Sequence, residues 1–419
     1  MRVKNKDDII NHFIEGNKNE SFIGVENEKF IFDKKSNKRS NYDQIKKVLN
    51  YLHDNFGWNK VEEEKNLIGL QQNNKQVTLE PGNQIELAGA KLKNIHEVCS
   101  ESYKFQHQLE SACNKFDLDL LSIGYDPKTK LSDVPSNPKK RYLVMKNEMP
   151  KNGKLSLEMM YQTAGTQINL DYSSEKNFTK KFKLISYLTP ISNAIFANSS
   201  IKENIFTKFL SYRTVVWQNT SRGGLPEIFL ENMDFEKYAD FCMNMPLLFL
   251  VKDGEYLTPD NFTFEDFMNN KIKKINMKSP DKKDLENHLS TIFTELRLKQ
   301  YLEIRSIDAC EWDCHCASPA FFTGLIYGDL EEALDIIKKW KPHDVLNAYF
   351  DSPKKGLFTE IHGKKIIEWA KIFLNICKSG LKSRNEINKK GNNEEIYLKN
   401  IENIISEEKT KAEKSIKIA

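Results

Sequence analysis

Residues 77–90, VTLEPGNQIELAGA, have the pattern of two short strand-like arms on either side of a tight Pro-Gly turn. The even separation of Glu80 and Glu86 can place both carboxylates on one face, because side chains alternate between the two faces of a strand. Ile85 and Leu87 then lie on the other face, where apolar side chains pack into a core. The stretch predicts a segment of sheet with one apolar face and one acidic face.

Three further segments repeat this alternation, namely IGVENEKF (23–30), TQINLDY (166–172) and QYLEIRSID (300–308). Across the four segments the polar positions are Glu26, Glu28, Gln84, Glu86, Gln167, Asn169, Asp171, Tyr301, Glu303 and Arg305. One interpretation is the ordinary solvated face of an antiparallel sheet. Solvated strand faces favour Thr, Lys, Ser and Arg, whereas these positions hold no lysine. The sequence therefore also permits a polar site built on a sheet.

Neighbouring strands would bring five carboxylates together: Glu26, Glu28, Glu80, Glu86 and Glu303. Two carboxylates 4 Å apart repel by about 1 kcal/mol in water and about 4 kcal/mol at an effective dielectric of 20. Such a cluster needs cations, and oxygen donors without His or Cys favour Mg²⁺ or Mn²⁺. Because Mg²⁺ held by carboxylates commonly binds nucleotide phosphates, the pattern indicates an ATP–Mg²⁺ site on a sheet face.

The nucleotide is not held by a familiar loop, since the chain contains neither GxxxxGK[ST] nor GxGxxG. This excludes P-loop and Rossmann folds. Metal ions and basic side chains are then expected to bind the phosphates. The candidates are Arg222, beside Gly223-Gly224, and Arg297 and Lys299 before the last strand. Arg222 is equally well interpreted as a surface turn residue.

The composition is that of a soluble globular protein, with 39% hydrophobic and 29% charged residues among 419. A formal net charge of +4 predicts no nucleic-acid or membrane partner. The start, MRVKNKDDIINHFIEG, lacks the apolar core of a signal peptide. Seven cysteines are ordinary usage, which predicts a reducing, cytoplasmic setting. The chain is expected to be a monomer or a homodimer.

Strand-like segments lie among helical ones without strict alternation, so the fold class is α+β with a mainly antiparallel sheet. Strands are expected at 21–32, 160–172 and 299–308, and helices at 7–15, 43–52, 92–115 and 176–197. After Pro319 the chain is almost wholly helical. We expect a single catalytic domain, 1–419, with 320–419 as a helical C-terminal annex.

Five segments carry a family resemblance: IGVENEKFIF, VTLEPGNQIELAGA, YQTAGTQINLDYSSE, SYRTVVWQNTSRGGLPEIF and ENHLSTIFTELRLKQYLEIRSID. In this order they resemble the plant and alphaproteobacterial glutamate–cysteine ligases. The resemblance implies a glutamine-synthetase-like curved, mainly antiparallel sheet with helices packed outside. It also implies ATP-dependent ligation of L-cysteine to the γ-carboxylate of L-glutamate through a γ-glutamyl phosphate, the first step of glutathione synthesis.

By motif position, the resemblance assigns metal binding to Glu26, Glu28, Glu80, Glu86, Gln167 and Glu303. Asn169 is assigned to the nucleotide, with Arg222, Arg297 and Lys299 as further ATP contacts. Arg213 and Trp217 resemble the glutamate-site pair, and Glu303 and Arg305 are the catalytic candidates. The implied cofactor is Mg²⁺, or Mn²⁺, with ATP as co-substrate.

The cysteine-rich segment near residue 310 has more than one interpretation. Cys99 and Cys316 resemble a family redox pair, although two unrelated buried thiols fit as well. ACEWDCHCASP (309–319) has no second CxxC, which disfavours zinc. Leu248 replaces a substrate-side tyrosine of the plant pattern, so a ligase with another amine acceptor remains an alternative. A non-catalytic glutamate or nucleotide sensor is a further one.

Overall fold

The central element of the fold is one large, mainly antiparallel sheet with the order β14-β15-β7-β1-β5-β4-β3-β2, in which β6 also pairs with β1. The computed structural model describes residues 2–273 and 279–416. The strands of this sheet are β1 (Ile23–Asp33), β2 (Asn59–Glu63), β3 (Asn66–Gln72), β4 (Lys75–Leu79), β5 (Ile85–Ala88), β6 (Leu118–Leu121), β7 (Gly165–Leu170), β14 (Leu296–Leu298) and β15 (Leu302–Asp308). All of their pairings are antiparallel.

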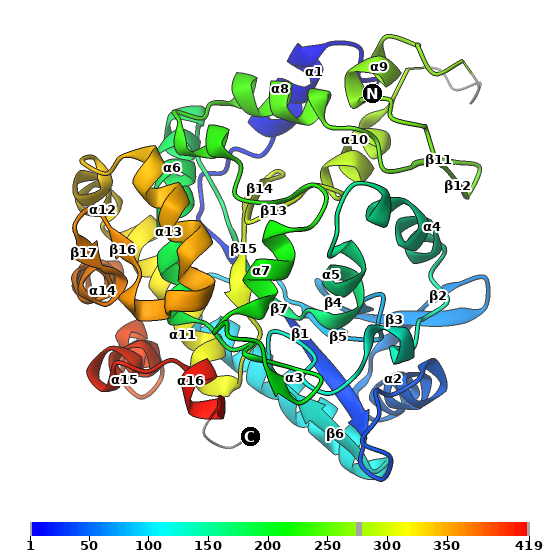
Figure 1. Ribbon diagram of the computed structural model, residues 1–419, viewed down its shortest axis with the longest axis horizontal. Helices are drawn as coiled ribbons and strands as arrows, with labels where there is room; N and C mark the ends of the chain where they lie inside the picture. The colour runs from blue at the N-terminus through cyan, green and yellow to red at the C-terminus, as the bar shows by residue number, and fades with distance from the viewer. Residues whose placement is uncertain (1, 274–278, 417–419) are drawn as a thin grey trace.

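Helices surround this sheet (Figure 1). They are α1 (Lys6–Ile14), α2 (Tyr42–Phe56), α3 (Ile95–Lys115), α4 (Lys140–Glu148), α5 (Ser156–Gln162), α6 (Glu175–Ile195), α7 (Tyr212–Gln218), α8 (Phe235–Asn244), α9 (Phe264–Met268), α10 (Lys282–Leu289), α11 (Trp312–Thr323), α12 (Leu330–Ile337), α13 (Pro342–Lys355), α14 (Ile366–Arg384), α15 (Lys399–Glu407) and α16 (Lys411–Ile416). Short ribbons pair β8 (Ile201–Lys202) with β9 (Ile205–Phe206), β10 (Gly223–Gly224) with β13 (Phe293–Thr294), β11 (Leu250–Lys252) with β12 (Glu255–Leu257), and β16 (Glu360–Ile361) with β17 (Lys364–Lys365).

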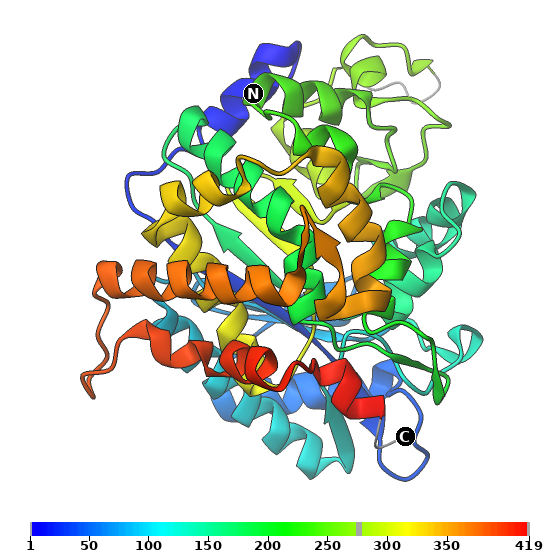
Figure 2. The same cartoon turned by 60° about the vertical axis from the view of Figure 1, so that its left-hand side comes forward.

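The apolar face of the sheet is covered by α3, α6 and α11, which pack on β1 and β15. Ile168, Leu170 and Ile304 from this face are fully buried. In Figure 2 the orange and red C-terminal helices lie in front of the sheet. One apolar cluster runs from Val3 to Ile405 and so joins these helices to the sheet. This continuity supports a single domain with a helical annex, which stays a prediction.

Local sequence signals explain where the helices begin and end. The side chain of Asn94 accepts a hydrogen bond from Glu97 N at the start of α3, and Ser174 does the same for Asn177 N at α6. Helix α2 ends at Gly57, whose φ of 72° lies in the left-handed region. These caps agree with the predicted helices near 43–52, 92–115 and 176–197.

The predicted strand over 160–172 is only partly correct. Residues Ser156–Gln162 form α5, and β7 begins at Gly165. Thr163 Oγ1 donates to Met159 O (2.6 Å) at the end of this helix. Methionine and glutamine have good helix propensity, and the helix buries Met159 and Met160. In the described parts of the chain, no helix is long and apolar enough to span a bilayer.

Candidate active site

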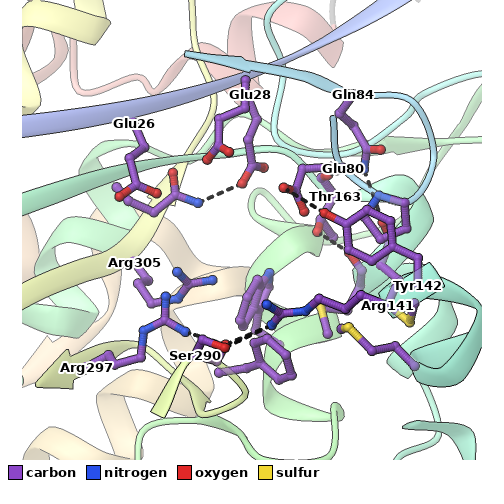
Figure 3. Close-up of a pocket in the computed structure, with 18 of the residues that line it drawn as sticks. Glu26, Glu28, Glu80, Gln84, Arg141, Tyr142, Thr163, Ser290, Arg297 and Arg305 are labelled. Atoms are coloured by element: carbon purple, nitrogen blue, oxygen red, sulfur yellow. Dashed lines mark hydrogen bonds between the residues drawn. The ribbon is translucent and has the colours of Figure 1, made fainter. Parts of the chain in front are cut away.

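A cavity of about 250 Å³ lies between the polar face of the sheet and α4, α5 and α7 (Figure 3). Its lining residues are Glu26, Glu28, Glu80, Pro81, Gln84, Glu86, Arg141, Tyr142, Met145, Met159, Met160, Thr163, Gln167, Trp217, Ser290, Phe293, Arg297, Lys299 and Arg305. Figure 3 shows Glu26, Glu28 and Glu80 on one side and the guanidinium groups of Arg141, Arg297 and Arg305 opposite them. The cavity therefore has an acidic wall facing a basic one.

The strand register explains how the acidic wall forms. Glu28 on β1 lies directly opposite Glu86 on β5, and Glu26 lies opposite Gln167 on β7. Glu80 belongs to the turn between β4 and β5, where Glu80 N donates to Gln84 O (2.9 Å). The sheet therefore gathers these predicted polar positions on one face.

Hydrogen bonds orient the carboxylates at the centre of the sheet. Gln167 Nε2 and Gly165 N donate to the two oxygens of Glu28 at 2.7 and 2.6 Å. Burial, followed by the charge of Glu80, raises the pKa of Glu28 to about 7. Burial and the charges of Glu80, Glu26 and Glu28 raise the pKa of Glu86 well above its usual value. This wall holds its full negative charge only when a cation compensates it.

The basic wall is organised around Glu303. Arg297 Nε donates to its carboxylate, while Lys299 Nζ lies 3.4 Å and Arg305 NH1 3.5 Å away. Burial opposes ionisation of Glu303, but Arg297, then Lys299 and Arg305, hold its pKa well below the usual range. The described lining residues do not include Glu303. Glu303 therefore forms the centre of an ion-pair cluster, apart from the four cavity carboxylates.

The indole of Trp217 lies between two guanidinium groups. The carbons at the centre of the Arg213 and Arg305 guanidiniums are 5.0 and 5.1 Å from the centroid of the Trp217 ring. Arg213 NH2 also donates to Arg305 O (2.8 Å). Trp217 and Arg305 line the cavity, whereas the fully buried Arg213 supports Trp217 from behind.

Two predicted nucleotide contacts lie elsewhere. Arg222 donates to Thr291 O (2.7 Å), to Thr291 Oγ1 (2.8 Å) and to Pro246 O. Arg222 is not among the residues that line the cavity, and its role as an ATP contact stays a prediction. Asn169 faces a neighbouring cavity of about 230 Å³, where its Nδ2 donates to Glu26 Oε1 (2.8 Å). Glu26 lines both cavities and connects them.

Other lining residues were absent from the sequence prediction. Arg141 and Tyr142 come from α4, and Tyr142 OH lies 3.3 Å from Glu80 Oε1. Arg141 NH2 lies 3.2 Å from Ser290 Oγ. Met145 and Met159 form an apolar part of the wall. Helix α4 follows a long irregular segment, so no strand period or motif indicated that it covers the sheet.

Four of the seven cysteines form two disulfide pairs near the start of α11. Cys99 on α3 is bonded to Cys316 on α11, with Cα atoms 5.8 Å apart. The structure also joins Cys310 to Cys314, a pair that the sequence reading did not predict. A redox role for the pair Cys99–Cys316 stays a prediction.

The chain thus has an α+β fold whose antiparallel sheet faces a cavity with opposed carboxylates and guanidiniums, an arrangement suited to a highly charged substrate. The sequence profile described as glutamate–cysteine ligase family 2 matches residues 22–417. The chain belongs to this family.

Plant proteins are among its relatives. Glutamate–cysteine ligase B, chloroplastic, of Oryza sativa subsp. japonica is 37% identical over 99% of this chain and 84% of its own length. The chloroplastic glutamate–cysteine ligase of Arabidopsis thaliana is 36% identical over 99% of this chain and 79% of its own. These comparisons contradict the cytoplasmic location expected from the sequence, since both relatives are chloroplastic.

A solved structure supports the fold. The glutamate–cysteine ligase of Francisella tularensis in complex with AMP superimposes with a TM-score of 0.52 at 13% identity. The match covers 96% of this chain and 85% of that one. The α+β architecture with a mainly antiparallel sheet and outer helices is thereby confirmed.

Proposed function

We propose that this cavity is the active site for ATP-dependent ligation of L-cysteine to the γ-carboxylate of L-glutamate. This is the reaction of the glutamate–cysteine ligase family, and it forms γ-glutamylcysteine, ADP and phosphate in the first step of glutathione biosynthesis. The observation that supports it most directly is the acidic wall of Glu26, Glu28, Glu80 and Glu86 opposite Arg297, Lys299 and Arg305.

The chemistry proceeds in two steps. A glutamate γ-carboxylate oxygen attacks the γ-phosphorus of ATP, which forms γ-glutamyl phosphate and releases ADP. The amine of cysteine then attacks the acyl carbon, loses a proton and expels phosphate. Neither step needs a protein nucleophile, so the task of the chain is to position the reactants and offset their charges.

The donor set of the acidic wall fits a hard divalent cation. Its ligands would be carboxylate oxygens of Glu26, Glu28, Glu80 and Glu86. Gln167 Oε1 is buried and lacks a hydrogen-bond partner within the described residues, so it can add a neutral oxygen. As placed, no three His, Cys, Asp or Glu side chains of residues 2–273 and 279–416 enclose a common metal position. A bound Mg²⁺ or Mn²⁺ would offset the charge of the ATP phosphates there.

The basic wall suits the phosphates. Arg297 and Lys299 present fixed positive charge beside Glu303, and Arg305 lies between them and the indole of Trp217. We assign Arg297 and Lys299 to the phosphate oxygens and Arg305 to the transferring phosphoryl group. The neighbouring cavity, with Asn169 and Tyr301 in its wall, can take the rest of the nucleotide.

The amino-acid substrates fit the part of the cavity that α4, α5 and α7 line. Trp217, backed by Arg213, offers a flat wall for glutamate, and Arg141 offers a guanidinium fork for a carboxylate. Arg141 Nε is buried and has no hydrogen-bond partner among the described residues. Met145, Met159 and Met160 form a polarizable apolar surface suited to a thiol side chain.

The test is phosphate release from ATP with glutamate and Mg²⁺, with and without cysteine, together with mass spectrometry of the product. The result expected is cysteine-dependent phosphate release with γ-glutamylcysteine formed. Parallel reactions contain 2-aminobutyrate or simple amines in place of cysteine. Phosphate release driven by another amine would reassign the acceptor, and binding of ATP or glutamate without turnover would indicate a sensor.

Two matched variants test whether the reaction takes place in this cavity. Glu28→Gln removes one carboxylate of the acidic wall and should abolish turnover. Glu394→Gln changes a fully buried glutamate, paired with Arg384 outside the cavity, and should retain turnover. Equal activity of both variants would contradict the assignment of the site.

A further inference from the structure

The turn between β4 and β5, residues Glu80–Gln84, is hydrogen-bonded to distant parts of the chain. Asn137 Nδ2 donates to Glu80 O (2.6 Å), and Gln84 Nε2 donates to Thr163 O (2.8 Å). Asn83 Nδ2 donates to Ser40 O (3.2 Å). Such anchoring is unusual for a turn, since turns normally expose their polar groups to water.

Arg39 makes a further buried contact with the turn. Its side chain is 1% exposed, and its NH2 donates to Gly82 O, at the centre of the turn. Its NH1 donates to Asp126 Oδ2 (2.9 Å), and the guanidinium lies 4.5 Å from the centroid of the Phe30 ring. Arg39 therefore links the turn to a second loop through a buried ion pair.

The second loop is itself fixed. Asp126 is fully buried, and its Oδ1 accepts hydrogen bonds from Lys128 N and Thr129 N, both at 2.9 Å. The turn also packs closely on the end of α5, because a Cβ added at Gly82 would lie 2.5 Å from Tyr161 O. The position of the turn is thus determined from both sides.

Burying an ion pair costs desolvation energy that its attraction barely offsets, so such pairs are a weak source of stability. A positional role is the better explanation here. The turn carries Glu80 into the acidic wall, where its charge is close enough to Glu28 and Glu86 to repel them. Without an anchor, this repulsion would push Glu80 outward into the solvent.

We propose that Arg39 is a positioning residue, which acts through Gly82 and Asp126 to hold Glu80 beside Glu28 and Glu86 for a divalent cation. This inference rests on the proposed function, because it requires the cation to bind at the acidic wall. Arg39 itself touches neither the cavity lining nor the reacting groups, since its donors go to Gly82, Asp126 and Tyr161.

The test measures Mn²⁺ binding to the full chain without substrates, by electron paramagnetic resonance of the free ion. Arg39→Met should weaken Mn²⁺ binding by roughly 10- to 100-fold, the range typical of groups that orient metal ligands. Arg39→Lys keeps the charge but loses the two-pronged geometry, so its affinity should fall between those of wild type and Arg39→Met.

Arg384→Met is the matched control. Arg384 Nε is 3.1 Å from Glu394 Oε2 in a largely buried ion pair on another part of the chain. Its loss should lower thermal stability and leave Mn²⁺ affinity unchanged. Equal losses of Mn²⁺ affinity in Arg384→Met and Arg39→Met would overturn the proposal.

A double variant tests whether Arg39 affects Mn²⁺ binding through Glu80. If Arg39 acts through Glu80, then Arg39→Met should weaken Mn²⁺ binding no further in a Glu80→Gln background. An equal additional loss in that background would show general damage and would reject the positional role. Should Arg39→Met fail to fold, Asp126→Asn leaves the guanidinium in place and tests the same Glu80 dependence.

Glu28→Gln distinguishes a failure of the proposed cation site from a failure of the proposed role of Arg39. If Mn²⁺ binds wild type and Glu28→Gln equally, the proposed cation site is wrong. If Glu28→Gln loses Mn²⁺ but Arg39→Met and Asp126→Asn do not, the site stands and the role of Arg39 is wrong.

Discussion

Glu28 and Glu86 are direct cross-strand partners in the middle of the sheet. Like charges at such positions destabilise a sheet. Here the repulsion is increased by burial, which raises the pKa of both groups. The pair thus has a cost to stability, which the cation site proposed above would explain.

Glu86→Gln should stabilise the metal-free protein and impair catalysis. The fold keeps a proton on Glu86 that the unfolded chain releases above about pH 4.5, so the stability gain should grow as pH rises above that value. Thr78 Oγ1, which donates to the carboxylate, can also donate to the amide oxygen. Urea unfolding in EDTA at pH 4.5 and 7.5 measures the gain. A loss of stability at pH 7.5 would contradict this account.

Glu303→Gln should destabilise the protein whether or not metal is present. The substitution leaves Arg297, Lys299 and Arg305 without their shared carboxylate, and breaking a buried pair costs about 3 to 5 kcal/mol. Unfolding in EDTA and in Mg²⁺ measures this loss. Glu331→Gln, in an exposed pair with Lys180, should change stability by less than about 1 kcal/mol. If Glu303→Gln instead keeps its stability in EDTA but loses Mn²⁺ binding, Glu303 is a metal ligand after all.

Trp217→Leu should raise the KM for glutamate with little effect on the KM for ATP. The substitution removes a ring that contacts two guanidiniums, each worth about 0.5 to 2 kcal/mol. Steady-state kinetics with each substrate varied in turn provide the measurement. Trp340→Leu, in a buried aromatic contact with Trp369 away from the cavity, serves as the control and should alter neither KM. A change confined to the KM for ATP would move glutamate to another part of the cavity.

His288 should make the protein sensitive to mild acid. Burial, then the charge of Arg222, lowers the pKa of this imidazole to about 3. Below about pH 6.5 His288 is protonated in the unfolded chain but stays neutral in the folded protein. The free energy of unfolding therefore falls as the pH falls from about 6.5 to 3. His288→Gln keeps a donor for Cys242 O and should remove up to about 1.4 kcal/mol per pH unit of that slope. Urea unfolding between pH 5 and 7 tests this. The exposed His107→Gln should leave the slope unchanged, and an unchanged slope in His288→Gln would refute the assignment.

Thiol titration should count three reactive cysteines in the unfolded, unreduced chain and seven after reduction. Cys113, Cys242 and Cys377 are free, whereas the other four form the pairs Cys99–Cys316 and Cys310–Cys314. Seven thiols before any reductant is added would show that neither pair is oxidised in solution. Cys310→Ser tests the second pair alone and should leave two cysteines unavailable until reduction.

The sequence predicted the sheet side of the site because strand geometry is simple. A period of two placed Glu26, Glu28, Gln167 and Glu86 on one face, and the register agrees. The sequence did not predict the part of the lining that α4 contributes, because Arg141 and Tyr142 reach the cavity through the path of an irregular segment. Local composition does not encode such a path.

The surroundings of Arg222 could not be predicted from its local sequence. An arginine beside two glycines has the composition of a phosphate-binding loop. Its φ of 68° instead places Arg222 in a turn, and its side chain donates hydrogen bonds to the carbonyls of Thr291 and Pro246. Glu303 was predicted correctly as a polar-face residue. Its ion pairs with Arg297 and Lys299 were not predicted, because the pairing of charges across two strands cannot be inferred from one segment.

The central place of β1 has a consequence for how the chain folds during synthesis. Its two edges pair with β5 and β7, and β7 in turn pairs with β15, which ends at Asp308. Pairings between such distant segments form slowly, because loop closure precedes any gain from contact. A nascent chain must therefore leave the ribosome past β15 before the two walls can face each other. Until then β7 exposes the edge that β15 will occupy, which makes early truncation products prone to aggregation.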